Sequence, residues 1–375
     1  MQPRALAVTA VSFLLAVGCG GAPAAVGATP TLAIDPRGEP LPPQPLPADG
    51  RLQLATEYWL GSEAEEQAQL AELGRRIVEL QRKAAADHGQ PLQRGFHAKS
   101  HACLHGRLVL ERQRDPRSRF GVFADGEPER PLVVRFSNGV GWKQGDSELD
   151  ARGMAVKVLG VPGPKYLPDE PGSQDFLMTN SPTPVGRDAV EFMDFAKANV
   201  GGRVFELLFA ASHPTTGAPA LARTSPIDSM ATAQYWSGGA YHLGAHQAIK
   251  YTARPCDPAR ERHPDHGAPD YLREDMMAAA RQGVCMRLFV QFQTDPFRTP
   301  VEDASREWDP AESPFVPVAR VLLPPQEPEP EATCDARAFT PWHAIPAHKP
   351  MGHINRARRW VYAASQGARQ ARPTP

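Results

Sequence analysis

The hydrophobic pattern of the chain begins with one long helical repeat. From residue 56 to about residue 86, apolar side chains recur at steps of three and four among many charged ones. A helix places such positions on one face, so the pattern predicts an amphipathic helix packed on the main domain. The positions that carry the repeat are Leu70, Leu73, Ile77 and Leu80.

A series of short strand-like runs follows this helix. The runs are rich in Val and Leu, and turns containing Gly, Pro and Asp separate them. Strands and helices do not alternate at regular spacing, which argues against a doubly wound parallel sheet. We therefore predict an α+β fold with a mainly antiparallel sheet or barrel and added helices. The runs are 107–111, 132–136, 154–159, 286–292 and 318–323.

The last predicted element is a basic helix. An acidic, proline-rich loop at residues 324–331 leads towards it, and residues 355–369 are rich in Ala and Arg without Pro. Arg358 and Tyr362 are four residues apart and share a helix face, to which Arg369 returns two turns later. Nearby guanidinium groups favour the phenolate form of a tyrosine, and a tyrosinate is one of the few protein ligands of haem iron. The alternative is a basic surface helix with a half-buried tyrosine.

The start of the chain has the features of an export signal. Residues 1–29 contain one charge, Arg4, then an apolar run too short to span a bilayer and a series of small residues. Residues 15–19 resemble a bacterial lipobox, in which Cys19 becomes lipidated, while ordinary cleavage near residues 24–28 is the alternative. We expect an exported protein, located in the periplasm or held at the cell envelope as a lipoprotein.

A proline-rich spacer separates this signal from the folded part. Seven prolines lie within residues 30–50, where apolar side chains are few, so we predict an extended tether over residues 30–55. The folded domain is expected over residues 56–375. Forty prolines in 375 residues are about twice the usual share, which favours long irregular segments.

Net charge and cysteine content narrow the function classes. The formal net charge is −1, so nothing global indicates a nucleic-acid partner or electrostatic attraction to an anionic membrane. Without Cys19, four cysteines remain, which permits two disulfides in an exported protein, and three pairings are open. No Cys-x-x-Cys spacing occurs, which argues against a structural zinc site.

A histidine before the first strand-like run is a candidate acid/base. His97 lies in the segment Arg-Gly-Phe-His-Ala-Lys-Ser at residues 94–100, where it could act near neutral pH. His97, His101 and His105 would form a metal-binding face on a helix. Gly106 and the run behind it leave little room for such a helix. A structural or solvated histidine is the third alternative.

Three further segments carry polar residues at strand ends. They are Arg-Phe-Ser-Asn-Gly at 135–139, Leu-Asp-Ala-Arg-Gly-Met-Ala-Val-Lys at 149–157, and Asp-Phe-Leu-Met-Thr-Asn-Ser-Pro at 175–182. An Arg-Asp pair at 187–188 and two phenylalanines, Phe192 and Phe195, follow them. Each segment alone is ordinary turn chemistry.

Together and in this order, these motifs resemble the haem catalase family. The resemblance covers about residues 90–200 and again 350–370. It implies an eight-stranded antiparallel barrel with haem b against its outer wall, and helices and long loops around it. It implies peroxide as the small-molecule substrate and admits an organic electron donor; donor and oligomeric state stay open.

The resemblance also implies a role for individual residues. His97 would be the distal acid/base, with Ser137 holding its imidazole and Thr179 and Asn180 beside it. Tyr362 would be the proximal iron ligand, with Arg358 next to its oxygen. Three arginines, Arg94, Arg135 and Arg369, would bind the haem propionates. Either Phe192 or Phe195 would pack on the face of the haem.

The sequence departs from the family pattern in three places. Thr179 stands where catalases carry the first of two consecutive Asn, and Phe96 replaces a small residue before the distal His. The chain ends soon after the proximal helix, without the C-terminal domains of larger catalases. We therefore expect a minimal catalase-like protein that acts as a weak catalase or a peroxidase. Hydroperoxide rearrangement, as in allene oxide synthases, and haem binding without turnover are the alternatives.

Overall fold

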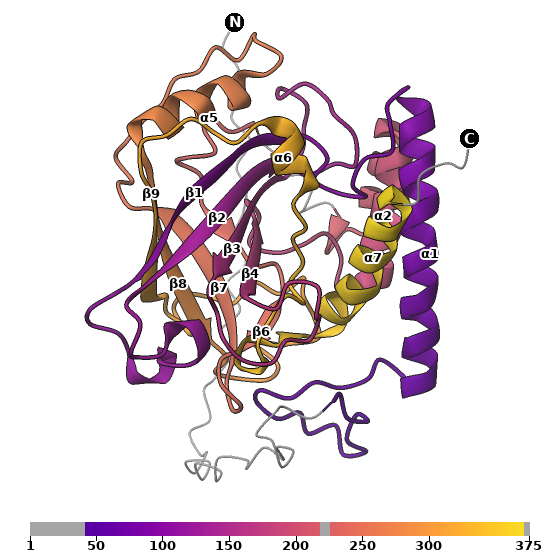
Figure 1. Cartoon of the computed structure of the whole chain (residues 1–375). Helices are drawn as coiled ribbons and strands as arrows, with labels where there is room; N and C mark the ends of the chain where they lie inside the picture. Colours follow the sequence, from indigo (N-terminus) through magenta and orange to yellow (C-terminus); the bar gives the residue numbers. More distant parts are fainter. Residues whose placement is uncertain (1–41, 218–225, 371–375) are drawn as a thin grey trace, which may run out of the picture. The chain divides into compact units, whose positions relative to one another are not determined.

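The strands of the protein form a closed antiparallel barrel (Figure 1). The computed structural model describes residues 42–217 and 226–370. Eight strands pair in the ring order β7-β5-β4-β3-β2-β1-β9-β8, and pairing between β7 and β8 closes it. The predicted α+β fold with an eight-stranded barrel is confirmed. The ring strands are β1 Ser100–Leu110, β2 Glu129–Asn138, β3 Arg152–Leu159, β4 Ser173–Thr179, β5 Tyr235–Trp236, β7 Ala248–Pro255, β8 Val284–Phe292 and β9 Val316–Leu323.

Two short strands extend the sheet beyond the ring. Strand β6, Ala240–His242, pairs with β7, and β10, Pro350–Met351, pairs with β6. All five predicted runs coincide with observed strands, apart from Glu111, which lies just beyond β1. The strands begin earlier than expected, and β2 and β3 do so because their first residues are polar. Strands β4 and β7 were not predicted, because polar residues interrupt their apolar pattern. In β4 these are Gln174 and Asp175. In β7 they are Lys250, Thr252 and Arg254.

Side-chain alternation along the strands separates the barrel interior from its outer face. On β2, Val134 and Phe136 belong to the main hydrophobic core, whereas Arg135 and Ser137 between them do not. The same alternation on β4 places Phe176 and Met178 in that core and leaves the intervening residues outside it. Apolar side chains therefore fill the barrel, and its outer face is available for a site.

Helices cover one side of this outer face. Helix α1, Glu63–Asp87, packs against the last helix, α7, His353–Gln370, and against α2, Ala189–Gly201. Figure 1 shows these three helices beside β4 and β3. Both predicted helices are present, but α1 starts at Glu63 because Ser62 caps it: the Ser62 hydroxyl accepts from the Glu65 N–H, and the Glu65 carboxylate accepts from the Ser62 N–H. The other α-helices within the described residues are α3 Arg203–Ser212, α5 Tyr271–Gln282 and α6 Glu331–Ala336.

The segment before α1 pairs with itself and is bonded to the domain through the side chain of Gln293. Gln44 forms an isolated bridge with Tyr58, and the Ala55 N–H donates to Gln293 at 2.6 Å. The expected signal at 1–29, with Cys19, and the first part of the expected tether lie outside the described residues. Among residues 42–217 and 226–370, we find no helix that is both long and apolar enough to cross a membrane.

A buried ionic network joins this segment to the start of α7. Arg356 is bonded to Glu66 at 2.9 Å, to Glu57 at 3.1 Å and to Glu302 at 3.0 Å. Lys349 donates to Glu57 at 2.6 Å. Because these residues come from four parts of the sequence, the network fixes where the last helix begins.

The two disulfides have a definite pairing, which the sequence left open. Cys103 of β1 is bonded to Cys334 of α6, and Cys256 to Cys285 of β8. The helical metal face of the three histidines does not form, because His101 and His105 lie on strand β1. His101 is bonded to Asn138 at 2.8 Å.

Candidate functional site

A cavity lies between the outer face of β2–β4 and helices α1, α2 and α7. Its empty space, counted out to its open mouth, is about 1410 Å³. Most of its walls are apolar. The polar and charged residues that line it are Arg94, His97, Arg135, Ser137, Thr179, Ser237, Arg358, Tyr362, Ser365, Gln366 and Arg369.

His97 enters the cavity from the turn before β1. Its backbone has φ 60°, an uncommon conformation for a residue with a side chain, and its N–H donates to the Gly139 carbonyl at 2.8 Å. Nδ1 of its ring lies 3.1 Å from Ser137 Oγ. When Nδ1–H donates to this hydroxyl, Nε2 carries the lone pair and can accept a proton.

The space for this imidazole exists because residue 153 is a glycine. A Cβ on Gly153 would lie 2.6 Å from the His97 ring and 2.9 Å from Ser137 Oγ. The turn opposite is held by Asp150, whose carboxylate accepts from the Gly139 N–H at 2.9 Å and the Val140 N–H at 3.2 Å. The position of His97 is therefore determined on both sides.

The surroundings of His97 keep its imidazole neutral. The ring faces the cavity, so part of its surface is accessible, and protein surrounds the rest. Burial, reinforced by the positive charge of Arg135 and of Arg358, lowers the pKa of His97 to about 3. At neutral pH the ring can accept a proton, as a general base must.

Helix α7 forms another wall, on which Tyr362 and Arg358 meet. Arg358 donates to the Tyr362 oxygen at 3.2 Å, as the spacing of four predicts. The other end of its guanidinium donates to Tyr241 at 3.2 Å and to Asn355 at 3.0 Å. Burial opposes the charge of Arg358, but the neighbouring Tyr362 and Tyr241 raise its pKa. The guanidinium is thus fixed beside the phenol oxygen.

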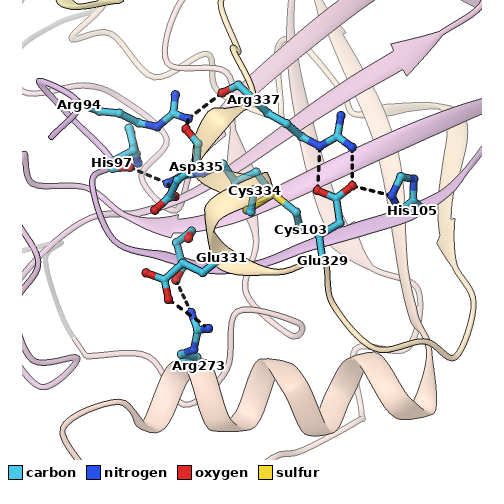
Figure 2. The surroundings of a disulfide bond; sticks show 12 residues. Arg94, His97, Cys103, His105, Arg273, Glu329, Glu331, Cys334, Asp335 and Arg337 are labelled. Carbon is cyan, nitrogen blue, oxygen red and sulfur yellow. Dashed lines mark hydrogen bonds and ion pairs between the residues drawn. A yellow bond between two sulfur atoms is a disulfide. The ribbon is translucent and has the colours of Figure 1, made fainter. Parts of the chain in front are cut away.

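Three arginines gather at one end of the cavity. Arg94 donates to the carbonyls of Asp335 and Arg337 at 2.7 and 2.6 Å, as Figure 2 shows. Burial, with repulsion from Arg135 and Arg369, lowers the pKa of Arg94 to about 9. Burial also lowers the pKa of Arg135 and of Arg369, and the Nε atom of each is buried without a hydrogen-bond partner. Such a group is stabilised by an anion that binds there.

Of the expected distal pair and the expected phenylalanine pair, one residue each lines the cavity and the other packs behind it. Thr179 lines the cavity, but Asn180 does not. The side-chain oxygen of Asn180 instead accepts a hydrogen bond from the Arg152 N–H at 2.6 Å. Phe192 lines it and packs edge-on against Phe96 at 5.3 Å. Phe195 instead packs against Phe209 of α3, at 5.6 Å between ring centroids.

This arrangement suits a flat, apolar ring that carries carboxylates and a central metal. The apolar walls would hold the ring, the arginines its carboxylates, and Tyr362 the metal. The described residues contain no group of three or more His, Cys, Asp or Glu side chains that could hold a metal ion by themselves.

Solved structures provide the comparison that identifies the fold. No protein-family model matches the chain, and no curated protein matches it. A bacterial catalase has a TM-score of 0.60 and 20% identity, with 87% of this chain and 64% of that one covered. A fungal catalase has a TM-score of 0.62 and 18% identity, with 91% of this chain and 69% of that one covered. Catalase A from Saccharomyces cerevisiae has a TM-score of 0.61 and 18% identity, with 90% of this chain and 70% of that one covered.

The fold is that of the catalases. This chain spans just under two thirds of the bacterial catalase it matches. Within the catalase fold, the sequence motifs come together: nine of the eleven predicted site residues line the one cavity. Asn180 and Phe195 are the two that do not.

Sequence reasoning missed several residues at the site, among them Gly153, Tyr241 and Asp335. Gly153 stands inside a recognised motif, and its close contact with an imidazole could have been suspected there. Tyr241, which binds Arg358, lies in a stretch with no strand pattern. Asp335, whose carboxylate lies 3.4 Å from Arg135, carries no signal in the sequence at all.

Proposed function

We propose that this protein binds haem b and breaks down hydrogen peroxide or organic hydroperoxides. Tyr362 would ligate the iron, and Arg94, Arg135 and Arg369 would bind the propionates. The observation that carries the proposal is one cavity lined both by a neutral histidine bonded to Ser137 and by a tyrosine bonded to Arg358. The catalase fold supports it.

The roles of the protein groups follow from their positions. Bound haem iron would supply the electrons that break the O–O bond. His97, neutral at working pH, would accept the proton of one peroxide oxygen at Nε2 and deliver it to the other, which leaves as water. Ser137 would keep the imidazole oriented through Nδ1. Arg358 would balance charge on the Tyr362 oxygen.

The choice between catalase and peroxidase activity in this proposal rests on Thr179. Oxygen release requires a second peroxide held in register, and a displacement of about one ångström can cost roughly a hundredfold in rate. A Thr hydroxyl is shorter than an Asn amide and can also accept a hydrogen bond. We therefore propose weak catalase activity together with peroxidase turnover of small organic donors.

The test uses hemin-reconstituted protein. Oxygen release, oxidation of an organic donor and the products from a lipid hydroperoxide are measured on the same preparation. We expect donor oxidation to exceed oxygen release and both to disappear in His97→Ala while hemin stays bound. His105→Ala, an exposed histidine on β1, is the control.

Three other results of these assays would change the proposed function. Activity that survives in His97→Ala would remove His97 from its role. Rearranged hydroperoxide without net reduction would favour an isomerase of allene oxide synthase type. A hemin spectrum without turnover would indicate a binding protein.

We also propose that the protein is exported and tethered to the cell envelope through Cys19. The two disulfides support an oxidising compartment, since disulfides persist there. Mass spectrometry of the mature N-terminus should detect an acylated Cys19. A free N-terminus near residue 28 would leave export standing and refute the anchor.

A further inference from the structure

The short helix α6 is fastened to the barrel next to the arginine end of the cavity. Cys334 of α6 is bonded to Cys103 of β1, and both are fully buried beside Val133 (Figure 2). The Glu329 N–H donates to the Cys103 carbonyl at 3.0 Å and adds a second attachment. The residue after Cys334 is therefore held at a fixed place on the outer face of the barrel.

That residue, Asp335, faces the arginines with both its main chain and its side chain. Its carbonyl accepts from Arg94, and its carboxylate lies 3.4 Å from Arg135 and 3.7 Å from Lys143. Its negative charge also opposes the lowering of the pKa of Arg369 by burial. Asp335 is thus the carboxylate that acts on all three arginines.

The other carboxylates of this segment are engaged elsewhere. Glu329 binds Arg337 and, at 2.6 Å, the exposed His105. Glu331 binds Lys143 at 2.6 Å and Arg273 at 3.3 Å, on the side of α6 that faces α5 (Figure 2). Neither forms an ion pair with Arg94, Arg135 or Arg369 among the described residues.

We propose that Asp335, fixed by the Cys103–Cys334 disulfide, is a specificity-determining residue that sets the charge of the carboxylate-binding end of the cavity. Lys143 is paired with Glu331, so three guanidinium groups and the Asp335 carboxylate leave two positive charges, one fewer than the arginines alone would offer to a ligand with carboxylates. The inference rests on the proposed haem binding, and it concerns which side groups of the ring the cavity selects.

The charge balance gives a measurable selectivity. Hemin carries two carboxylates, and hemin dimethyl ester has the same ring and iron without them. The ratio of their affinities for the apoprotein isolates the arginine end, because contacts with the ring and with Tyr362 cancel. A variant that merely loosens the fold weakens both ligands and leaves the ratio unchanged.

The experiment measures this ratio in the wild type and in Asp335→Asn. We expect the wild type to prefer hemin, and Asp335→Asn to raise the preference about tenfold, because a competing negative charge beside the arginines is lost. Glu329→Gln removes a carboxylate from the same segment and should leave the ratio at the wild-type value. An unchanged or lower ratio in Asp335→Asn, or an equal rise in Glu329→Gln, would overturn the proposal.

The disulfide is tested with a matched pair of variants. Cys103→Ala with Cys334→Val fills the buried space without the covalent bond, so Asp335 can move away from the arginines and the ratio should rise. Cys256→Ser with Cys285→Ser removes the other disulfide, none of whose residues lines the cavity, and should not change it. An unchanged ratio in the first pair would refute the role of the disulfide. If that pair does not fold, the Asp335→Asn comparison decides alone.

Ligand binding by the wild-type apoprotein distinguishes a failure of this inference from a failure of the proposed function. Wild-type apoprotein that binds neither hemin nor its ester would refute haem binding, and the inference falls with it. Equal affinity for both ligands would leave haem binding intact and overturn the inference about the charged end.

Discussion

The buried ionic network at the start of α7 supports one quantitative prediction. Arg356 is 6% exposed and contacts Glu57, Glu66 and Glu302, as well as the Tyr58 carbonyl at 3.1 Å. Replacing it by Met keeps the length of the side chain and removes the charge. Glu57 would then keep Lys349 as a bonded cation, whereas Glu66 and Glu302 would lose the guanidinium that binds them.

The expected cost is large because the carboxylates stay buried. Breaking a buried ion pair by removing one partner costs about 3–5 kcal/mol, so Arg356→Met should lower the free energy of unfolding by that amount. With a urea slope of about 3 kcal/mol/M, the unfolding midpoint falls by roughly 1–1.7 M. Arg359→Met, an exposed residue of the same helix, should cost less than about 1 kcal/mol.

The pH dependence of this loss tests its electrostatic origin. Burial already raises the pKa of Glu302 in the wild type, against the attraction of Arg356. Without that attraction the folded-state pKa of Glu302 rises further above its unfolded value, so the folded variant binds more protons than the folded wild type. The stability that this group contributes is present at low pH and is lost as pH rises, so the difference from wild type should be smaller at pH 5 than at pH 8. A loss below 1 kcal/mol, or one independent of pH, would refute the reasoning.

Three further predictions concern the cavity. Thr179→Asn should raise oxygen release relative to donor oxidation, measured on one hemin-loaded sample; an unchanged ratio would show that Thr179 does not limit the reaction. Gly153→Ala, whose Cβ would displace the His97 ring, should reduce peroxide turnover about a hundredfold while hemin still binds. Because burial lowers the pKa of His97 to about 3, the imidazole loses no base function between pH 8 and 5, and kcat/KM for peroxide should lack an acid limb near about pH 6.5.

Local patterns in the sequence predict the fold where one face of an element is buried. β2 could be predicted because Leu132, Val134 and Phe136 alternate with residues of the outer face. β7 could not, because its polar side chains are buried through contacts far away in sequence, such as Lys250 with the Arg306 carbonyl at 2.8 Å. The helical spacing of Arg358 and Tyr362 predicts their contact directly.

Long-range pairing accounts for the part of the site that the sequence could not supply. Cys103 and Cys334 are 231 residues apart, and no local rule selects this pairing from three. Asp335, which follows Cys334 directly, lies 3.4 Å from Arg135, a contact between residues 200 positions apart. Asn180 was expected in the site, yet its amide holds the Arg152 backbone, since adjacent residues at a strand end point in different directions.

The central claim is that Tyr362 ligates haem iron in this cavity, and one measurement tests it directly. Visible and resonance Raman spectra are recorded for hemin-loaded wild type, Tyr362→Phe and, as control, Tyr58→Phe, whose hydroxyl accepts from the Gln53 N–H outside the cavity. We predict stoichiometric hemin with phenolate vibrations in the wild type and in Tyr58→Phe, and their loss, with weaker hemin binding, in Tyr362→Phe. A spectrum of Tyr362→Phe identical to that of the wild type, or wild-type protein that binds no hemin, would contradict the account.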